Sequence, residues 1–366
     1  MKTILLVFGT RPEAIKMCPL VNELKRHPNA FKTVVCVTGQ HREMLDQVLT
    51  AFEVVPEYDL AVMKESQTLF SITSEVLLKM EQVLDVVCPD IVLVHGDTTT
   101  SFAAATAAFY KQISVGHVEA GLRTHNLASP FPEEFNRQAV DVVSRYYFAP
   151  TQDSRDNLLR EGKDDCRIVV TGNTGIDALR TTVVDNYRHP VLDWADGFRT
   201  ILITAHRREN LGAPMHAMFR AIRRVVDEYS DVKAIYPVHL NPAVQRAAQQ
   251  ELAGCDRIRL IDPLDVLDFH NFMAKSHMIL TDSGGIQEEA PSLGKPVLVM
   301  RDTTERPEGI LAGTLKLVGT DEDTIYRECS LLLDDSVRYE AMSRASNPYG
   351  DGFASERIVQ ALLSDM

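Results

Sequence analysis

The stretch Ile91-Val92-Leu93-Val94-His95-Gly96-Asp97-Thr98-Thr99-Thr100 decides the fold class. Its first four residues are all apolar, which is typical of a strand in a parallel sheet that helices cover on both faces. A segment with helical periodicity, residues 99–110, follows directly. A buried strand that leads into a helix is the repeating unit of α/β folds.

The same alternation runs along the whole chain. We expect strands at residues 3–8, 32–37, 91–94, 113–118, 146–148, 167–170, 200–204, 232–236, 258–261, 278–280, 296–299 and 314–318. We expect helices at 12–26, 43–52, 68–86, 99–110, 134–143 and 154–160, and further helices between the later strands. Strands that alternate with helices imply right-handed crossovers, so the sequence predicts an α/β protein with doubly wound, Rossmann-like parallel sheets.

Length and an interruption of this alternation predict two domains. A chain of 366 residues is too long for one ordinary core. The alternation breaks at residues 172–199, where a polar, proline-containing segment precedes a new strand. We therefore expect domains at 1–172 and 173–366.

Composition narrows the class of protein. Apolar residues make up 45% and charged residues 24%, as in soluble globular proteins. The net charge of −13 argues against a nucleic-acid partner. Apolar runs of about five residues are far shorter than the roughly 20 that a membrane helix needs. No signal peptide is visible, and the six cysteines form no C-x-x-C pair, so we expect a cytoplasmic protein with buried, reduced thiols.

In open parallel sheets, ligands bind beyond the carboxyl ends of the strands. The first strand ends in Gly9-Thr10-Arg11-Pro12-Glu13, which has the spacing of a capping box at a helix N-terminus. Arg11 and Lys16 beside such an N-terminus would attract phosphate. An ordinary helix cap with solvated charges is the alternative.

Carboxylates follow two of the next strands and one proline-bracketed loop. Asp97 and Glu119 come at strand ends, and Glu133 follows Ser129-Pro130-Phe131-Pro132. If they lie close together they cannot all ionise freely, so one could stay protonated while another acts as a base. Taken singly, Asp97 could simply cap a helix and Glu133 could be a surface residue.

The second half carries a stronger pattern. His206, Arg207 and Arg208 follow one strand, and Asp282-Ser283-Gly284-Gly285 follows another. A double glycine at a helix N-terminus lets backbone amides approach a diphosphate. Glu288 or Glu289 lies one turn further, within reach of ribose hydroxyls. A plain glycine turn is the alternative.

Several familiar motifs are absent from the sequence. It contains no G-x-G-x-x-G, no G-x-x-x-x-G-K-[ST] and no G-x-S-x-G. His117, Glu119 and His125 are residue types that can ligate a metal, but their spacing matches no known metal motif. We expect neither a metal nor another cofactor.

Together these segments resemble the bacterial non-hydrolysing UDP-N-acetylglucosamine 2-epimerases. The resemblance rests on 9–16, 95–99, 117–123, 132–134, 206–209, 237–242, 282–294 and 347–352, in that order. It implies a glycosyltransferase-B-type fold, in which two Rossmann-like domains face a cleft and the last helix, about 353–366, crosses back to the first domain. It also implies a homodimer.

The resemblance further implies a reaction. UDP-N-acetylglucosamine and UDP-N-acetylmannosamine interconvert when the C2 proton and UDP are lost and then returned, in support of surface polysaccharide synthesis. By matching motif, Asp97, Glu119 and Glu133 would move the proton and His206 would stabilise the departing diphosphate. The substrate would be held by Arg11, Lys16, Phe269, Ser283, Gly284, Gly285, Glu289 and Arg306.

The sequence departs from the family pattern at two places. Leu264 stands where relatives have a glutamine beside the uracil base. Gln40, Glu43, Arg207 and His239 fall where some relatives bind a second, activating UDP-N-acetylglucosamine. Because Glu43 and Ser66 do not match that pattern, we expect weak or absent activation.

Three other functions remain open at this point. A hydrolysing 2-epimerase would release UDP and N-acetylmannosamine, and a glycosyltransferase would share the fold and the glycine-rich site. A regulatory module that binds a UDP-sugar without turnover would leave the three carboxylates unexplained.

Overall fold

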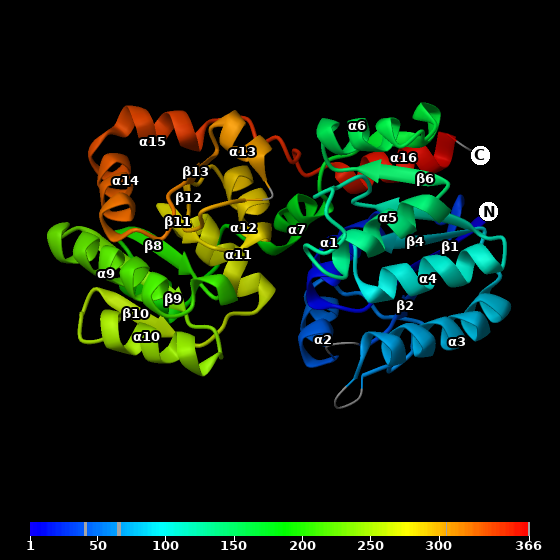
Figure 1. Ribbon diagram of the computed structural model, residues 1–366, viewed down its shortest axis with the longest axis horizontal. Helices are drawn as coiled ribbons and strands as arrows, with labels where there is room; N and C mark the ends of the chain where they lie inside the picture. The colour runs from blue at the N-terminus through cyan, green and yellow to red at the C-terminus, as the bar shows by residue number, and fades with distance from the viewer. Residues whose placement is uncertain (40–41, 64–66, 305, 365–366) are drawn as a thin grey trace. The chain divides into compact units, whose positions relative to one another are not determined.

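The computed structural model describes residues 1–39, 42–63, 67–304 and 306–364, which form two compact units (Figure 1). The first unit comprises residues 1–181 and 349–366, and the second comprises 182–348. The first unit thus continues past residue 172, where the sequence places the boundary. The reason is that α7 (Thr174–Thr182) hydrogen-bonds to the chain that returns at 352–355.

The first unit is built on a parallel sheet with the strand order β3-β2-β1-β4-β5-β6-β7. Its strands are β1 (Lys2–Phe8), β2 (Phe31–Val37), β3 (Tyr58–Asp59), β4 (Ile91–His95), β5 (Ser114–Val118), β6 (Tyr146–Ala149) and β7 (Ile168–Val170). Residues Ile4 to Phe8 and Val92 to Val94 are fully buried, as expected for apolar strands covered on both faces.

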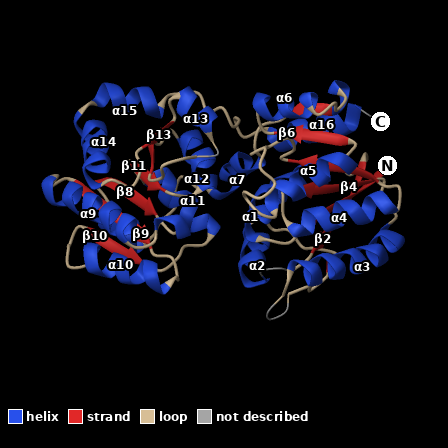
Figure 2. Cartoon of the chain, viewed as in Figure 1, coloured by secondary structure: helices blue, strands red, loops and turns tan. Residues whose placement is uncertain are grey.

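Helices cover this sheet (Figure 2). They are α1 (Arg11–Lys25), α2 (Arg42–Ala51), α3 (Leu69–Val87), α4 (Thr99–Tyr110), α5 (Glu133–Val143), α6 (Gln152–Arg160), η1 (Asp165–Arg167), α7 and α16 (Ala354–Ser364). The predicted capping box is present at α1: the Thr10 hydroxyl accepts from Glu13 N, and Glu13 Oε2 accepts from Thr10 N at 2.8 Å.

The second unit repeats the architecture, with the parallel strand order β10-β9-β8-β11-β12-β13. Its strands are β8 (Arg199–Thr204), β9 (Val232–Pro237), β10 (Ile258–Ile261), β11 (Met278–Thr281), β12 (Val297–Val299) and β13 (Leu315–Leu317). Its helices are α8 (Pro190–Ala195), η2 (Arg208–Asn210), α9 (Ala213–Glu228), α10 (Pro242–Leu252), α11 (Val266–Lys275), α12 (Gly284–Glu289), η3 (Ala290–Leu293), α13 (Pro307–Ala312), α14 (Glu322–Asp334) and α15 (Ser336–Ser343).

Both sheets are doubly wound, as predicted. The strand order reverses between β1 and β4 in the first unit and between β8 and β11 in the second. Such a switch point opens a crevice at the carboxyl ends of the strands, where ligands bind in open α/β sheets. The loops after these four strands therefore mark the candidate site in each unit.

The C-terminal helix α16 belongs to the first unit, where it packs against α1 (Figure 1). Buried Asp177 of α7 accepts hydrogen bonds from Ala354 N at 3.0 Å and Ser355 N at 2.6 Å, at the start of α16. This carboxylate takes up donors that a helix N-terminus leaves unpaired.

The prediction that the cysteines are buried is wrong in part. Cys18, Cys36 and Cys329 are buried, and burial raises the pKa of each thiol to about 12. Cys88 and Cys166 are exposed, because Cys88 caps the C-terminus of α3 and Cys166 lies in the short helix η1, so neither is inside a buried strand. All six cysteines are free thiols. In the part of the chain that the structure describes, no helix combines the length and the apolarity that crossing a membrane requires.

Candidate active site

The centre of the site in the first unit is Glu119, which follows β5. Its Oε2 forms an ion pair with Lys16 Nζ of α1 and accepts from Asn173 Nδ2 at 3.3 Å. His95 Nε2, at the end of β4, lies 3.5 Å from the same oxygen and has no hydrogen-bond partner among the described residues. Three elements distant in sequence thus converge on one carboxylate.

Electrostatics keep this carboxylate ionised. Burial raises the pKa of Glu119, but Lys16 and then His95 outweigh burial and hold its pKa well below the usual range. The Glu119 backbone has a φ of +69°, a left-handed conformation that is costly for a residue with a side chain. The fold therefore fixes Glu119 in a strained position as an anion.

Asp97, after β4, has a different cationic partner. Its carboxylate contacts Arg137 Nη2 of α5, and its backbone carbonyl accepts from Asn136 Nδ2 at 2.9 Å. Arg137 Nη1 also lies 3.3 Å from Glu134 Oε2. Arg137 thus links Asp97 to the start of α5.

Buried Glu134 holds the loop that precedes α5. It accepts from the backbone N–H groups of Thr124 and His125, each at 3.0 Å, and from Gln138 Nε2 at 2.8 Å. Burial raises the pKa of Glu134, but these hydrogen bonds and Arg137 lower it overall. Its neighbour Glu133, the first residue of α5, is partly buried. Within the described residues, the Glu133 side chain has no hydrogen bond or ion pair.

Among the described residues, Asp97, Glu119 and Glu133 form no hydrogen bond to one another. Asp97 and Glu119 each have their own cation, Arg137 and Lys16. The idea that crowding keeps one carboxyl protonated therefore does not apply to Glu119, whose pKa is lowered and not raised.

The His117 ring is buried between two oxygen partners. Both of its ring nitrogens are engaged: Nδ1 lies 2.6 Å from Asp141 Oδ1 and Nε2 lies 2.8 Å from the Gly96 carbonyl. Among the described residues, no group of three or more His, Cys, Asp or Glu side chains is arranged to hold a metal ion.

In the second unit, Asp282 organises the loop after β8. This fully buried carboxylate accepts from the backbone N–H groups of His206 and Arg207, each at 2.9 Å, and from Asn210 Nδ2 at 3.1 Å. Because Asp282 follows β11, it ties together the two loops that flank the switch point.

His206 is held between Asp282 and His239. Its ring stacks on His239 with centroids 5.3 Å apart, and its Nδ1 lies 3.6 Å from Asp282 Oδ1. Burial lowers the pKa of His206, Asp282 opposes that change, and His239 and Arg207 lower the pKa further. The result is an imidazole that favours its neutral form and is 40% exposed.

The double glycine opens α12, as predicted. A Cβ at Gly284 would lie only 3.2 Å from Arg306 Cζ, so the absent side chain makes room for that guanidinium. Arg306 Nε donates to Glu288 Oε1 at 2.9 Å. Glu289 Oε2 lies 3.5 Å from buried His270 Nε2, so Glu288 and Glu289 have separate partners.

The remaining predicted residues fall on the same two edges or outside the described parts. Arg11 begins α1, Ser283 precedes α12, and Phe269 is a partly buried residue of α11. Gln40 lies outside the described residues, and Glu43 is placed in α2 by its backbone alone.

The sequence did not single out Arg137, Asp141, Asn173 or the separate role of Asp282. The spacing of Glu134 and Arg137, one helical turn apart, could have pointed to Arg137.

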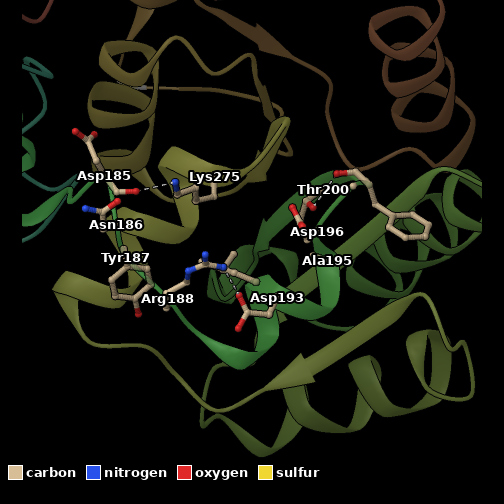
Figure 3. A pocket seen from close by; sticks show the side chains of 12 residues that line it. Asp185, Asn186, Tyr187, Arg188, Asp193, Ala195, Asp196, Thr200 and Lys275 are labelled. Atoms are coloured by element: carbon tan, nitrogen blue, oxygen red, sulfur yellow. Dashed lines mark hydrogen bonds and ion pairs between the residues drawn. The ribbon is translucent and has the colours of Figure 1, made fainter.

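A polar cavity of about 410 Å³ in the second unit is lined by none of these residues (Figure 3). It borders Thr200 near the start of β8. Lys275 Nζ donates to the Asp185 carbonyl at 3.3 Å, and Arg188 Nη1 lies 3.4 Å from Asp193 Oδ1. Because this cavity borders the amino end of a strand, it is separate from the switch-point site.

Two doubly wound parallel sheets, each with charged side chains at its switch point, define an α/β protein of the glycosyltransferase-B type. A family model described as UDP-N-acetylglucosamine 2-epimerase matches residues 22–363. The chain belongs to this family of epimerases.

Individual relatives support the same family assignment. The chain is 63% identical to the UDP-N-acetylglucosamine 2-epimerase of Bacillus subtilis, with 98% of this chain and 94% of that protein covered. It is 52% identical to that of Escherichia coli K12, over 99% of this chain and 98% of that protein. The crystal structure of the Neisseria meningitidis enzyme bound to UDP-GlcNAc superposes with a TM-score of 0.90 at 49% identity, covering 99% and 100% of the two chains.

Proposed function

We propose that this chain interconverts UDP-N-acetylglucosamine and UDP-N-acetylmannosamine without releasing free sugar. Family membership supports the substrate and the epimerisation. The observation that carries the chemistry is Glu119, an ionised carboxylate held by Lys16 at the switch point of the first sheet. An anion there can accept a proton from carbon.

The reaction balances without an external reagent. A carboxylate takes the C2 proton, the C2–H electron pair forms a C1=C2 double bond, and the C1–O pair leaves with UDP. UDP then returns to C1 while a proton is delivered to the opposite face of C2. We assign the proton transfers to Asp97, Glu119 and Glu133, without dividing the steps among these carboxylates.

Lys16 connects the two halves of this chemistry. While it contacts Glu119 it weakens that carboxylate as a base, because it lowers the pKa. A diphosphate that drew Lys16 away would raise the pKa of Glu119 and so strengthen the base as the substrate binds. This accommodates the phosphate role expected for Lys16 and Arg11.

The second unit supplies the leaving-group site in this proposal. The backbone at Ser283, Gly284 and Gly285 and the Arg306 guanidinium would hold the diphosphate, with His206 beside it. Phe269 would border the uracil and Glu289 the ribose. Because the C2 proton is only weakly acidic, stabilisation of the departing UDP must lower much of the barrier.

One incubation tests the proposal. The purified chain is mixed with UDP-N-acetylglucosamine in heavy water, and the anomeric and C2 signals are followed by NMR. We expect a mixture of both UDP-sugars with deuterium at C2. Free N-acetylmannosamine would indicate a hydrolysing enzyme, and conversion only with an added acceptor would indicate a glycosyltransferase. Binding without turnover would indicate a regulatory module.

We also propose a homodimer formed through the face of α3, α4 and α5. A groove of about 570 Å³ on this face is lined mainly by apolar side chains, and Phe70 is 88% exposed there. Exposed apolar patches of this kind are typical of protein interfaces. Sedimentation should show a dimer that Phe70→Glu dissociates, whereas Leu311→Glu, at an 86% exposed position of the second unit, should not. A monomer at all concentrations would contradict this.

The cellular setting is part of the same proposal. Free thiols at all six cysteines agree with a reducing compartment such as the cytoplasm. There the product would serve bacterial surface polysaccharide synthesis.

A further inference from the structure

A buried polar cluster lies behind the carboxylates of the first unit and takes no part in the chemistry assigned so far. It consists of His117, Arg123 and Asp141, whose side chains are fully buried. Asp141 Oδ1 lies 2.6 Å from His117 Nδ1, and Asp141 Oδ2 accepts from Arg123 Nη2 at 2.7 Å. Burial raises the pKa of Asp141, but His117 and Arg123 lower it overall, so the carboxylate is ionised.

The cluster reaches the two loops that carry Asp97 and Glu119. His117 Nε2 lies 2.8 Å from the carbonyl of Gly96, the residue before Asp97. Asp141 Oδ2 accepts from the backbone N–H of Gly121 at 3.3 Å, two residues after Glu119. One carboxylate on α5 therefore fixes the backbone beside both candidate catalytic groups.

Both loops turn through left-handed backbone, and in the Glu119 loop that conformation falls on a residue with a side chain. Gly96, Glu119 and Gly121 have φ values of +62°, +69° and +85°. For Glu119 this conformation is strained, and it persists only where the surroundings enforce it. The hydrogen bond from Gly121 N to Asp141 holds the backbone two residues after Glu119.

Stability alone is a weak explanation for the cluster. Buried ion pairs gain little net free energy, because removing the charges from water offsets their attraction. The strand pairing around the cluster also has other anchors: Gly96 N donates to Val118 O at 2.9 Å and Glu119 N to Phe148 O at 3.0 Å. What Asp141 adds is a link between two loops.

We propose that Asp141 is a positioning residue for proton transfer, which acts through His117 on the Asp97 loop and through Gly121 on the Glu119 loop. The inference rests on the proposed epimerase function. Asp141 touches neither Asp97 nor Glu119. Its loss should therefore shift the positions of these two carboxylates without removing either of them. A misplacement of about 1 Å lowers a rate by about 10²-fold.

The experiment compares Asp141→Ala and Asp141→Asn with the unsubstituted chain. We expect kcat and C2 deuterium exchange to fall about 10²-fold in Asp141→Ala, with KM and UDP affinity within threefold. Asp141→Asn keeps an acceptor for His117 and should recover part of the rate. Asp177→Asn is the control. It removes another buried carboxylate of the same unit, which accepts hydrogen bonds from the start of α16 and not from the Asp97 or Glu119 loop.

The outcomes separate the possibilities. Unchanged kcat in folded Asp141→Ala overturns the inference, as does an equal loss in Asp177→Asn, which would indicate general destabilisation. If circular dichroism shows that Asp141→Ala does not fold, Asp141→Asn decides: a lower kcat at unchanged KM supports positioning, and a normal kcat overturns it. If the unsubstituted chain itself exchanges no deuterium, the proposed function has failed, and this inference with it.

Discussion

At the scale of single residues, the partner of each acidic group sets what that group can do. Lys16 and His95 keep Glu119 ionised against the effect of burial. Both carboxylate oxygens of Asp282 accept from the backbone N–H of His206, which orients the His206 loop. Similar carboxylates thus serve as a candidate base in one unit and as a backbone anchor in the other.

We predict that Lys16→Met raises the pKa of Glu119, because the largest of the interactions that oppose burial is then removed. In the unsubstituted chain the depressed pKa keeps Glu119 ionised down to acid pH. In the variant the acid limb of the kcat/KM profile should move to higher pH. The check is the pH dependence of kcat/KM between pH 5 and 9, with Lys25→Met, an exposed lysine of the same helix, as control. Superimposable profiles would argue against the pairing.

The same pair affects stability. Because folding lowers the pKa of Glu119, its ionisation stabilises the fold above the unfolded pKa of about 4.3. This contribution is lost as pH falls through the lower, folded pKa. Glu119→Gln should therefore show a smaller loss of Tm on acidification than the unsubstituted chain. An identical slope of Tm against pH would mean that the pKa is not lowered on folding.

We predict that Asp97→Asn lowers kcat by about 10²- to 10⁴-fold, the range for removal of a general acid or base. UDP binding, measured by calorimetry, should change little, because the proposed diphosphate groups other than Arg11 and Lys16 lie in the second unit. Asp165→Asn removes another Asp–Arg contact of the first unit, 2.6 Å from Arg155, and should keep normal turnover. Normal turnover in Asp97→Asn would exclude Asp97 from the mechanism.

Sequence reasoning could place Asp97 and Glu119 because each comes directly after an apolar strand, and parallel strands bring such positions to one edge. It could not find Asp141, whose partner His117 is 24 positions away and on a different element. The contact between Lys16 and Glu119 spans 103 positions and depends on how α1 packs over the sheet. Pairings of this kind are tertiary, and no local pattern encodes them.

At the scale of elements, strands were predictable where apolar runs are buried on both faces. The segment Ile258–Ile261 agrees with the prediction at both ends, and α4 agrees as well. The strand β3 was missed because it has two residues, of which Asp59 is exposed, and carries no apolar run. Short edge strands are defined by pairing with a neighbour, here β2, and not by their own composition.

We predict that Gly121→Ala destabilises the first unit by more than the positive φ alone explains. An added Cβ would lie 2.2 Å from the Ser154 carbonyl oxygen of α6, so the overpacked site should cost about 1–3 kcal/mol beyond the backbone strain. Gly162→Ala is the control, since its φ is +76° but nothing lies within 4 Å. Denaturant unfolding measures both variants, and equal losses would contradict the clash.

At the scale of the whole molecule, the same fold occurs twice, and each sheet carries its own group of polar side chains. Each switch point gathers its own set of groups: carboxylates with cations in the first unit, and a histidine, a double glycine and Arg306 in the second. Of Arg207 and His239, considered for a second substrate site, His239 stacks on His206, and the Arg207 backbone N–H next to His206 donates to Asp282. Both residues therefore lie beside His206.

We therefore predict hyperbolic kinetics. Conversion of UDP-N-acetylmannosamine should proceed without added UDP-N-acetylglucosamine, because Glu43 and Ser66 depart from the pattern of the activated relatives. Initial rates of the reverse reaction, measured with and without trace UDP-N-acetylglucosamine, provide the check. A strict requirement for the added nucleotide sugar would show that the second site operates.

The return of α16 to the first unit bears on how the protein is made. The second unit is continuous in sequence, so it can collapse as soon as residue 348 has left the ribosome. The first unit is completed only by residues 349–366, although translation of that unit began earlier. Until those residues emerge, the surface of α1 that α16 covers is exposed on the nascent chain, and this interval is when chaperone binding would matter most.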